Sequence, residues 1–190
     1  MTFFQRLFGQ IIFSLLVCPG FLYAQPWITN GPRGKNILAI TQSPTNSNLL
    51  YAGAFGWGVF KSSDGGSTWT NRSTGMVNTY VRSILALTDN FVWAGTNEGV
   101  FRTTDGGTSW TPYVFASRSI RALAYNGSTN TVYAATFGAG LYKNTDGGLS
   151  SFGPLITADP VSGETLLRQQ AIAVFGSNSL YVGGSIGDIG

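Results

Sequence analysis

The sequence "SSDGGSTW" at residues 62–69 recurs twice further along the chain. "TTDGGTSW" occupies residues 103–110, and "NTDGGLSS" occupies residues 144–151, where serine replaces the tryptophan. The three aspartates are evenly spaced, since 105 − 64 and 146 − 105 both equal 41. A fixed period of this length is typical of a protein built from structural repeats, so the repeat unit is the first guide to the fold.

Each repeat unit reads as four short β-strands, here called A to D in chain order. An apolar segment such as "ILAL" comes first, followed by segments such as "YAGA" and "GVFKS", and the fourth begins at the tryptophan. Alternation of apolar and polar residues, aromatic residues and punctuating glycines all favour strands. We therefore predict an all-β fold: a β-propeller of four-stranded blades, with the DGG sequence in the hairpin between strands C and D. A stacked β-solenoid is the alternative, but its rungs are usually shorter.

The repeats also suggest where the blades begin and end. We predict a closing strand at residues 25–34, because "PWITNG" resembles "TWTNRS" at 68–73. Three blades and a part do not close a ring, which normally needs four to eight. We therefore expect the N-terminal part of a longer protein; a short chain that assembles with copies of itself is the alternative. The blades are predicted at residues 35–73, 80–113 and 117–153, with a partial fourth at 169–190.

Composition excludes several classes of function. The chain has 190 residues, of which 43% are hydrophobic and 10% charged, so it can build a core and is too apolar to be disordered. The net charge of +3 is spread along the chain, whereas a nucleic-acid site needs clustered charge. There is no histidine, which excludes a His/Cys metal site and Ser-His-Asp or Cys-His catalysis within these residues. We expect no metal, no cofactor and no nucleic-acid partner.

The first 24 residues have the layout of a secretory signal peptide. Arg6 precedes an apolar run at residues 11–17, then Pro19 breaks the pattern, and the small Ala24 marks a cleavage site. A membrane anchor is the alternative, but the run is short for a span of ~20 residues. A lipoprotein signal through Cys18 is disfavoured because a small residue is normally wanted at position 17. We predict a secreted, periplasmic or cell-surface protein that is not inserted in a membrane after cleavage and has no disulfide.

The DGG sequences resemble the Asp-box, or BNR repeat, S-x-D-x-G-x-T-W. The first copy matches in full, the second matches with exchanged hydroxyl residues, and the third lacks the tryptophan. The resemblance implies a β-propeller, and this superfamily includes sialidases, xyloglucanase-type glycoside hydrolases, sortilin-like receptors and photosystem assembly factors, so it leaves the function open. The matching residues are Ser62, Asp64, Gly66, Thr68 and Trp69; Thr103, Asp105, Gly107, Ser109 and Trp110; and Asn144, Asp146, Gly148 and Ser150.

We interpret the DGG sequences as structural. Two glycines supply the positive φ of a tight hairpin, the carboxylate accepts hydrogen bonds from turn N–H groups, and the tryptophan packs between neighbouring sheets. A catalytic carboxylate needs one special environment rather than three equivalent ones. We therefore assign no catalytic residue.

Candidate ligand-binding residues lie in the B–C loops, which a propeller places on the face opposite the C–D turns. Aromatic side chains there stack on sugar rings or anchor a peptide; the alternative is that these rings pack between blades. The loops contain Phe55, Trp57, Glu98 and Phe137.

A second set of candidates is cationic. Lys35, Arg82 and Arg118 each lie four residues before an alanine of an A strand. One cation per blade would form a ring of positive charge at the channel mouth and favour an anionic ligand. The alternative is that these are solvated charges at strand ends.

Two classes of function remain. We expect an exported, non-enzymatic propeller that binds or scaffolds a protein or glycan ligand on the face of the B–C loops and D–A connections. The alternative is a sialidase- or xyloglucanase-like glycoside hydrolase, which needs two carboxylates flanking the glycosidic bond. A xyloglucanase-type enzyme would have an acid in the first B–C loop, and residues 53–57 contain none. The catalytic acids of such an enzyme would lie partly beyond residue 190.

Overall fold

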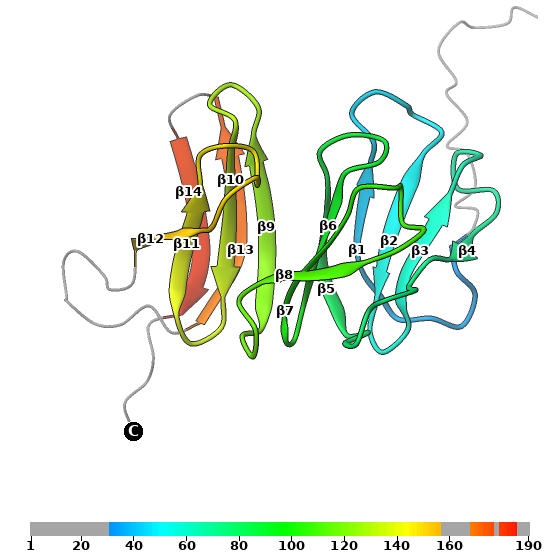
Figure 1. Cartoon of the computed structure of the whole chain (residues 1–190), viewed down its shortest axis with the longest axis horizontal. Coiled ribbons are helices and arrows are strands. Elements are labelled where there is room, and N and C mark those ends of the chain that lie inside the picture. Colours follow the sequence, from blue (N-terminus) through cyan, green and yellow to red (C-terminus); the bar gives the residue numbers. More distant parts are fainter. Residues whose placement is uncertain (1–30, 157–167, 177–178, 186–190) are drawn as a thin grey trace, which may run out of the picture.

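The computed structural model describes residues 31–156, 168–176 and 179–185. Within these residues every regular element is a β-strand, which confirms the predicted all-β class. Three four-stranded sheets and one two-stranded sheet stand side by side (Figure 1). No helix able to cross a membrane occurs in this part of the chain. The predicted signal peptide, residues 1–24, and residues 25–30 of the predicted closing strand lie outside the described residues.

Each sheet is formed by strands that are consecutive in sequence and antiparallel. The first contains β1 (Ile37–Gln42), β2 (Leu50–Ala54), β3 (Gly58–Ser62) and β4 (Thr70–Asn71). The second contains β5 (Val81–Ala86), β6 (Val92–Thr96), β7 (Gly99–Thr103) and β8 (Thr111–Val114). The third contains β9 (Ile120–Asn126), β10 (Thr131–Thr136), β11 (Gly140–Asn144) and β12 (Gly153–Ile156). The two-stranded sheet contains β13 (Arg168–Phe175) and β14 (Ser179–Ser185).

The sheets pack face to face in sequence order. The A strands follow one another, because β1 contacts β5, β5 contacts β9 and β9 contacts β13. Four-stranded antiparallel sheets arranged in this way are the blades of a β-propeller. The predicted fold is therefore confirmed, and the four sheets are called blades 1 to 4.

The three DGG turns, at residues 64–66, 105–107 and 146–148, join the C and D strands. Both glycines have a positive φ, for example 68° at Gly65 and 92° at Gly66, which residues with a side chain rarely adopt. The N–H of Gly65 donates to the carbonyl of Asn48 in the A–B turn at 2.9 Å, and the other two turns make the same bond with Asn90 and Asn130. The DGG turns and the A–B turns therefore lie at the same end of the blades.

The carboxylate of each DGG turn is an acceptor within its own hairpin. Oδ2 of Asp64 accepts from the hydroxyl of Thr68 at 2.6 Å, and Oδ1 accepts from the N–H of Thr68 at 2.9 Å and the hydroxyl of Ser62 at 2.8 Å. These bonds, with that from the Thr68 hydroxyl the strongest, lower the pKa of Asp64 to about 2. Asp105 has equivalent partners, and its pKa is also held below the usual range.

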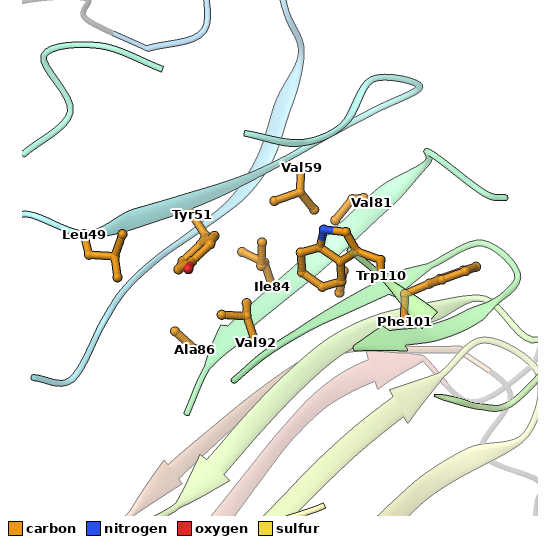
Figure 2. Close-up of a cluster of buried hydrophobic side chains, with 10 residues drawn as sticks. Leu49, Tyr51, Val59, Val81, Ile84, Ala86, Val92, Phe101 and Trp110 are labelled. Atoms are coloured by element: carbon orange, nitrogen blue, oxygen red, sulfur yellow. The ribbon is translucent and has the colours of Figure 1, made fainter. Parts of the chain in front are cut away.

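A hydrophobic core fills the space between blades 1 and 2 (Figure 2). Tyr51 and Val59 of blade 1 pack here with Ile84 and Trp110 of blade 2, and Figure 2 shows the Trp110 ring among side chains of both blades. The indole N–H of Trp110 donates to the carbonyl of Arg72 at 2.7 Å, so the ring also bonds the two blades together. Burying a ring of this size is a major contribution to interface stability.

The core between blades 2 and 3 uses a different aromatic arrangement. Trp93 of β6 is fully buried, and its ring centroid lies 5.5 Å from those of Tyr113 and Phe152. Ser151 occupies the position of Trp110 in the third repeat, and the neighbouring Phe152 supplies the aromatic ring instead. Gly148 lies directly against Trp93: a Cβ there would be 1.8 Å from Cζ2 of the indole.

Candidate functional site

The B–C loops and the D–A connections meet at the end of the blades opposite the DGG turns. The N–H of Gly58 donates to the carbonyl of Thr79 at 2.9 Å, and the N–H of Phe137 donates to the carbonyl of Ser119 at 2.8 Å. The first bond joins the B–C loop of blade 1 to the connection that leads into the A strand of blade 2. The second bond joins the B–C loop of blade 3 to the connection that leads into the A strand of the same blade. This end is called the loop face, and it carries the candidate ligand-binding residues predicted from the sequence.

A β-bulge near the start of each A strand decides which side chains are equivalent. The register shifts between Val81 and Ser83 in β5, and between Ile120 and Ala122 in β9. The extra residues at these bulges are Arg82 and Arg121. The bulges of blades 1 and 4 place Leu38 and Gln170 there instead.

This register corrects the count that gave one cation per blade. The count treated Ala39, Ala86 and Ala122 as equivalent, but Ser83 is the residue that pairs like Ala39 and Ala122, one position after the bulge. Lys35 and Arg118 are equivalent, since each lies two residues before the first paired residue of its A strand, Ile37 or Ile120. Arg82 lies one residue after Val81, the corresponding residue of blade 2, so it is not equivalent to them. The cations at the bulge position are Arg82 and Arg121, and the sequence signal that identifies them is the alignment of "VRSIL" at 81–85 with "IRALA" at 120–124.

Arg82 and Arg121 are electrostatically coupled. The pKa of Arg121 is lowered mainly by burial and also by the positive charge of Arg82. The guanidinium carbon of Arg121 lies 4.6 Å from the ring centroid of Phe137, and its Nε is buried without a hydrogen-bond partner in the described part of the chain. Nε of Arg82 donates to Oδ1 of Asn97, which also accepts from the hydroxyl of Ser119 at 3.3 Å.

The partners of this arginine pair are uncharged. Within the described ranges, Arg82 and Arg121 contact aromatic rings and an amide, and neither pairs with a carboxylate. Two partly desolvated cations without a counter-charge create a positive potential that attracts anions. This pair is the chemical centre of the loop face. Arg82 was predicted from the sequence as a candidate ligand-binding residue, and Arg121 was not.

The remaining candidates form separate pairs around this centre. Nζ of Lys35 lies 3.1 Å from the ring centroid of Trp57, whereas Arg118 donates from Nη1 to the hydroxyl of Tyr142 at 3.0 Å. The ring of Phe55 lies 5.4 Å from Arg82. Phe55, Trp57 and Phe137 expose 38%, 52% and 41% of their surface, and Phe55 also packs against blade 2, where its ring lies 4.9 Å from that of Tyr80.

Glu98 lies in a pocket of its own on blade 2. The pocket has a volume of about 280 Å³, and its other lining side chains include Val77, Pro112 and Val114. The connection that forms one wall contains two non-glycine residues in the left-handed region, Phe115 with φ 61° and Ser117 with φ 64°. Backbone strain of this kind is held in place by surrounding structure and is common at binding sites.

Other described carboxylates lie away from the loop face. Asp64, Asp105 and Asp146 are in the DGG turns, and Asp89 is in an A–B turn, where it accepts from the hydroxyl of Thr45 at 2.8 Å. Among the residues that the structure describes, no three His, Cys, Asp or Glu side chains gather as a metal site. Glu98 is thus the one carboxylate that the described residues place on the loop face.

No family model matches this chain, and no curated protein matches it. Solved structures do resemble it. An ancestral GH74 enzyme has a TM-score of 0.65 and 23% identity, covering 79% of this chain and 22% of that chain. "YCF48 bound to D1 peptide" has a TM-score of 0.53 and 21% identity, covering 65% and 41%. The extracellular domain of a putative hybrid two-component system from B. thetaiotaomicron has a TM-score of 0.59 and 20% identity, covering 78% and 20%.

These similarities concern the fold. At such identities a shared propeller architecture says little about a shared site, since one fold carries many functions. The chain spans about a fifth of the length of the GH74 enzyme and about two fifths of that of YCF48. The neighbours include both enzymes and a peptide-binding protein, so the loop face itself must carry the argument about function.

Proposed function

We propose that this protein is an exported, non-enzymatic propeller of the Asp-box type that binds an anionic segment of a protein or glycan on its loop face. The observation that carries the proposal is the pair of Arg82 and Arg121, which are coupled, partly desolvated and without a carboxylate partner in the described residues. Guanidinium groups bind carboxylates and phosphates through paired hydrogen bonds. The Nε of Arg121 is itself buried, so a ligand would be bound through the terminal nitrogens of the guanidinium group.

The surrounding side chains suit an elongated ligand. The exposed rings of Phe55 and Phe137 lie against Arg82 and Arg121, and the exposed ring of Trp57 lies against Lys35. Rings of this kind stack on sugars or pack against peptide side chains. The pocket beside Glu98 adds an apolar cavity with one negative charge. The peptide-bound YCF48 structure supports the idea that a propeller of this shape presents a polypeptide-binding surface.

The glycosidase alternative has less support from the described residues. Glycoside hydrolysis usually needs two carboxylates on either side of the bond that is cut. The described part of the loop face places Glu98 there and no second acid. The similarity to GH74 enzymes supports the propeller fold but identifies no catalytic residue in this chain.

The proposal is tested with two acidic probes, poly-L-glutamate and polygalacturonate oligosaccharide, and a neutral probe, xyloglucan oligosaccharide. Calorimetry should detect binding of an acidic probe that weakens as salt rises from about 50 mM to about 500 mM, because screening shortens the reach of the arginine charges. Arg121→Ala should lower the affinity about tenfold, as expected for loss of a charged hydrogen bond. Lys143→Ala removes the same charge at an exposed position of β11 and should leave the affinity unchanged.

Either of two results would reject the proposal. One is equal affinity of the wild type and Arg121→Ala for both acidic probes. The other is release of reducing sugar from xyloglucan by this chain, which would favour the glycosidase.

A further inference from the structure

The pocket beside Glu98 combines apolar walls with a single carboxylate. Val77, from the connection that joins blade 1 to blade 2, lines it together with Pro112 and Val114 of β8 and with Ala116 of the connection to blade 3. Its volume of about 280 Å³ lies just below the range of roughly 300–1,000 Å³ that is usual for whole small-molecule ligands. The pocket therefore suits one side chain of a larger ligand.

The walls of this pocket are fixed by packing within blade 2 and against blade 3. Gly99, next to Glu98, lies so close to β8 that a Cβ there would be 2.7 Å from the carbonyl oxygen of Val114. The ring of Phe115 lies 4.8 Å from that of Tyr142 and 5.2 Å from that of Phe152, both in blade 3. These contacts hold the connection in its strained conformation, so the pocket exists before a ligand arrives.

The charge of Glu98 has no counter-charge among the described residues. Its carboxylate accepts no hydrogen bond and forms no ion pair there. Arg102, on the neighbouring β7, lies instead over the ring of Tyr113, with its guanidinium carbon 4.2 Å from the ring centroid. Val77, on the opposite wall, is 83% exposed. Lysine and arginine carry a long apolar stem that ends in a positive charge, which matches an apolar wall beside a free carboxylate.

The pocket and the arginine pair share one loop. Asn97 accepts the hydrogen bond from Nε of Arg82, and Glu98 is the next residue, with consecutive Cα atoms about 3.8 Å apart. A ligand that is bound to the arginine pair therefore lies close to the pocket. A ligand with negative charges alone would meet Glu98 as a like charge, which disfavours it relative to a ligand that also carries a cation.

We propose that the Glu98 pocket binds a lysine or arginine side chain of the ligand. The ligand is then a polypeptide segment in which acidic residues, bound by Arg82 and Arg121, lie near a basic residue. This inference rests on the proposed function and narrows it from an anionic protein or glycan to a polypeptide of mixed charge.

The probe is a labelled peptide with a run of glutamates, a short spacer and one lysine, measured by fluorescence anisotropy with the full chain. Spacers of about two to five residues and both chain directions are included, because each residue adds up to about 3.5 Å of reach. Two control peptides replace the lysine with norleucine, which keeps the apolar stem, or with alanine. The best lysine peptide should bind about three- to fivefold more tightly than its norleucine counterpart, as expected for one partly exposed ion pair.

The sign of this difference is informative. Long-range attraction to the arginine pair alone would favour the norleucine peptide, because its net charge is more negative. Glu98→Gln should remove the preference for lysine over norleucine without lowering the affinity for the norleucine peptide, which is the pattern of a direct coupling between two groups.

A second variant separates the pocket from the charge. Ala116→Phe keeps Glu98 but fills the space between the walls, so it should remove the preference for the lysine peptide over the alanine peptide. Ala116 is exposed, and circular dichroism should show that this variant is folded. Arg121→Ala should weaken the binding of all three peptides, since each contains the glutamates.

The outcomes distinguish this inference from the function on which it rests. Equal affinities for the lysine and norleucine peptides, with both still weakened by Arg121→Ala, would overturn the pocket and leave the proposed function in place. Tighter binding of polygalacturonate than of any lysine peptide would also overturn it, in favour of a glycan ligand. Binding of no acidic probe at all would reject both.

Discussion

At the scale of single residues, the aspartates of the DGG turns make a pH-dependent contribution to stability. The pKa of Asp64 is about 2 in the folded protein, against a usual value of 3.8. A group with a lowered folded pKa contributes stability above its unfolded pKa and loses it as the pH falls through the folded value. Asp64 should therefore stabilise the protein above about pH 4, and this contribution should disappear between about pH 4 and pH 2.

We predict that Asp64→Asn lowers the melting temperature at pH 7 by a few degrees and flattens the fall in stability between pH 4 and pH 2. Thermal unfolding followed by circular dichroism across this range measures both effects. Glu98→Gln is the control, since the Glu98 carboxylate accepts no hydrogen bond within the described ranges, and it should leave the melting temperature at pH 7 unchanged. Parallel acid limbs for wild type and Asp64→Asn would contradict the prediction.

The residue scale also shows where inference from sequence succeeds and where it stops. The DGG geometry follows from local chemistry, because two glycines and flanking hydroxyls fix a turn without help from distant residues. The pairing of Arg82 with Arg121 depends on a bulge, which shifts the register by one residue and is not encoded by any single residue type. A count back from Ala86, which is not equivalent to Ala39 and Ala122, therefore grouped Arg82 with Lys35 and Arg118 and not with Arg121.

At the scale of elements, the close packing of a DGG turn against the preceding blade limits the residues allowed there. Gly148 has φ +88° and lies against Trp93, while Gly138 in a B–C loop has φ +90° and open space, with no atom within 4 Å of the point where a Cβ would lie. Alanine at either position therefore meets the same backbone strain, and only alanine at position 148 also collides with a buried ring.

We predict that Gly148→Ala destabilises the protein more than Gly138→Ala, by about 1–3 kcal/mol, the usual cost of overpacking a core. Urea denaturation of the two variants provides the comparison, with the strain of a positive φ cancelled between them. Equal midpoints would mean that Trp93 moves aside at little cost and that the turn does not fix the spacing of blades 2 and 3.

The elements themselves were largely predictable. Strands and hairpins could be assigned because segments such as "GVFKS" alternate apolar and polar residues and because glycines mark the B–C and C–D turns. The replacement of the third tryptophan by Phe152 could not, since position 151 carries serine and the aromatic ring comes from the next residue, which reaches the same core from a different point on the backbone.

At the scale of the whole molecule, blades contact mainly their immediate neighbours, so stability depends on each interface in turn. The interface of blades 1 and 2 contains an ionisable group. The pKa of Tyr51 is raised to about 12, mainly by burial and also by the negative charges of Asp89 and Asp105. A raised folded pKa means that the stability is present below the unfolded pKa of about 10 and is lost as the pH rises toward 12.

We predict that Tyr51→Phe reduces the sensitivity of the protein to alkaline unfolding between pH 10 and pH 12. At pH 7 the same change should cost about 0.5–1.5 kcal/mol, because the hydroxyl no longer donates to the carbonyl of Asp89. Denaturant titrations at pH 7, 10 and 11.5 would separate the two effects. Tyr181→Phe serves as the exposed control and should leave the stability at pH 7 unchanged. An unchanged alkaline limb in Tyr51→Phe would refute the prediction.

The DGG turns have one more consequence, which concerns chemical ageing. In a flexible chain an Asp–Gly bond degrades because the glycine nitrogen attacks the side-chain carbonyl and closes an imide ring, a reaction that favours the protonated acid. In all three turns the glycine N–H is held by an asparagine carbonyl of the A–B turn, and the lowered pKa keeps the aspartate ionised. Folding therefore shields three otherwise labile bonds, and isoaspartate should accumulate in the denatured chain well before it does in the native protein.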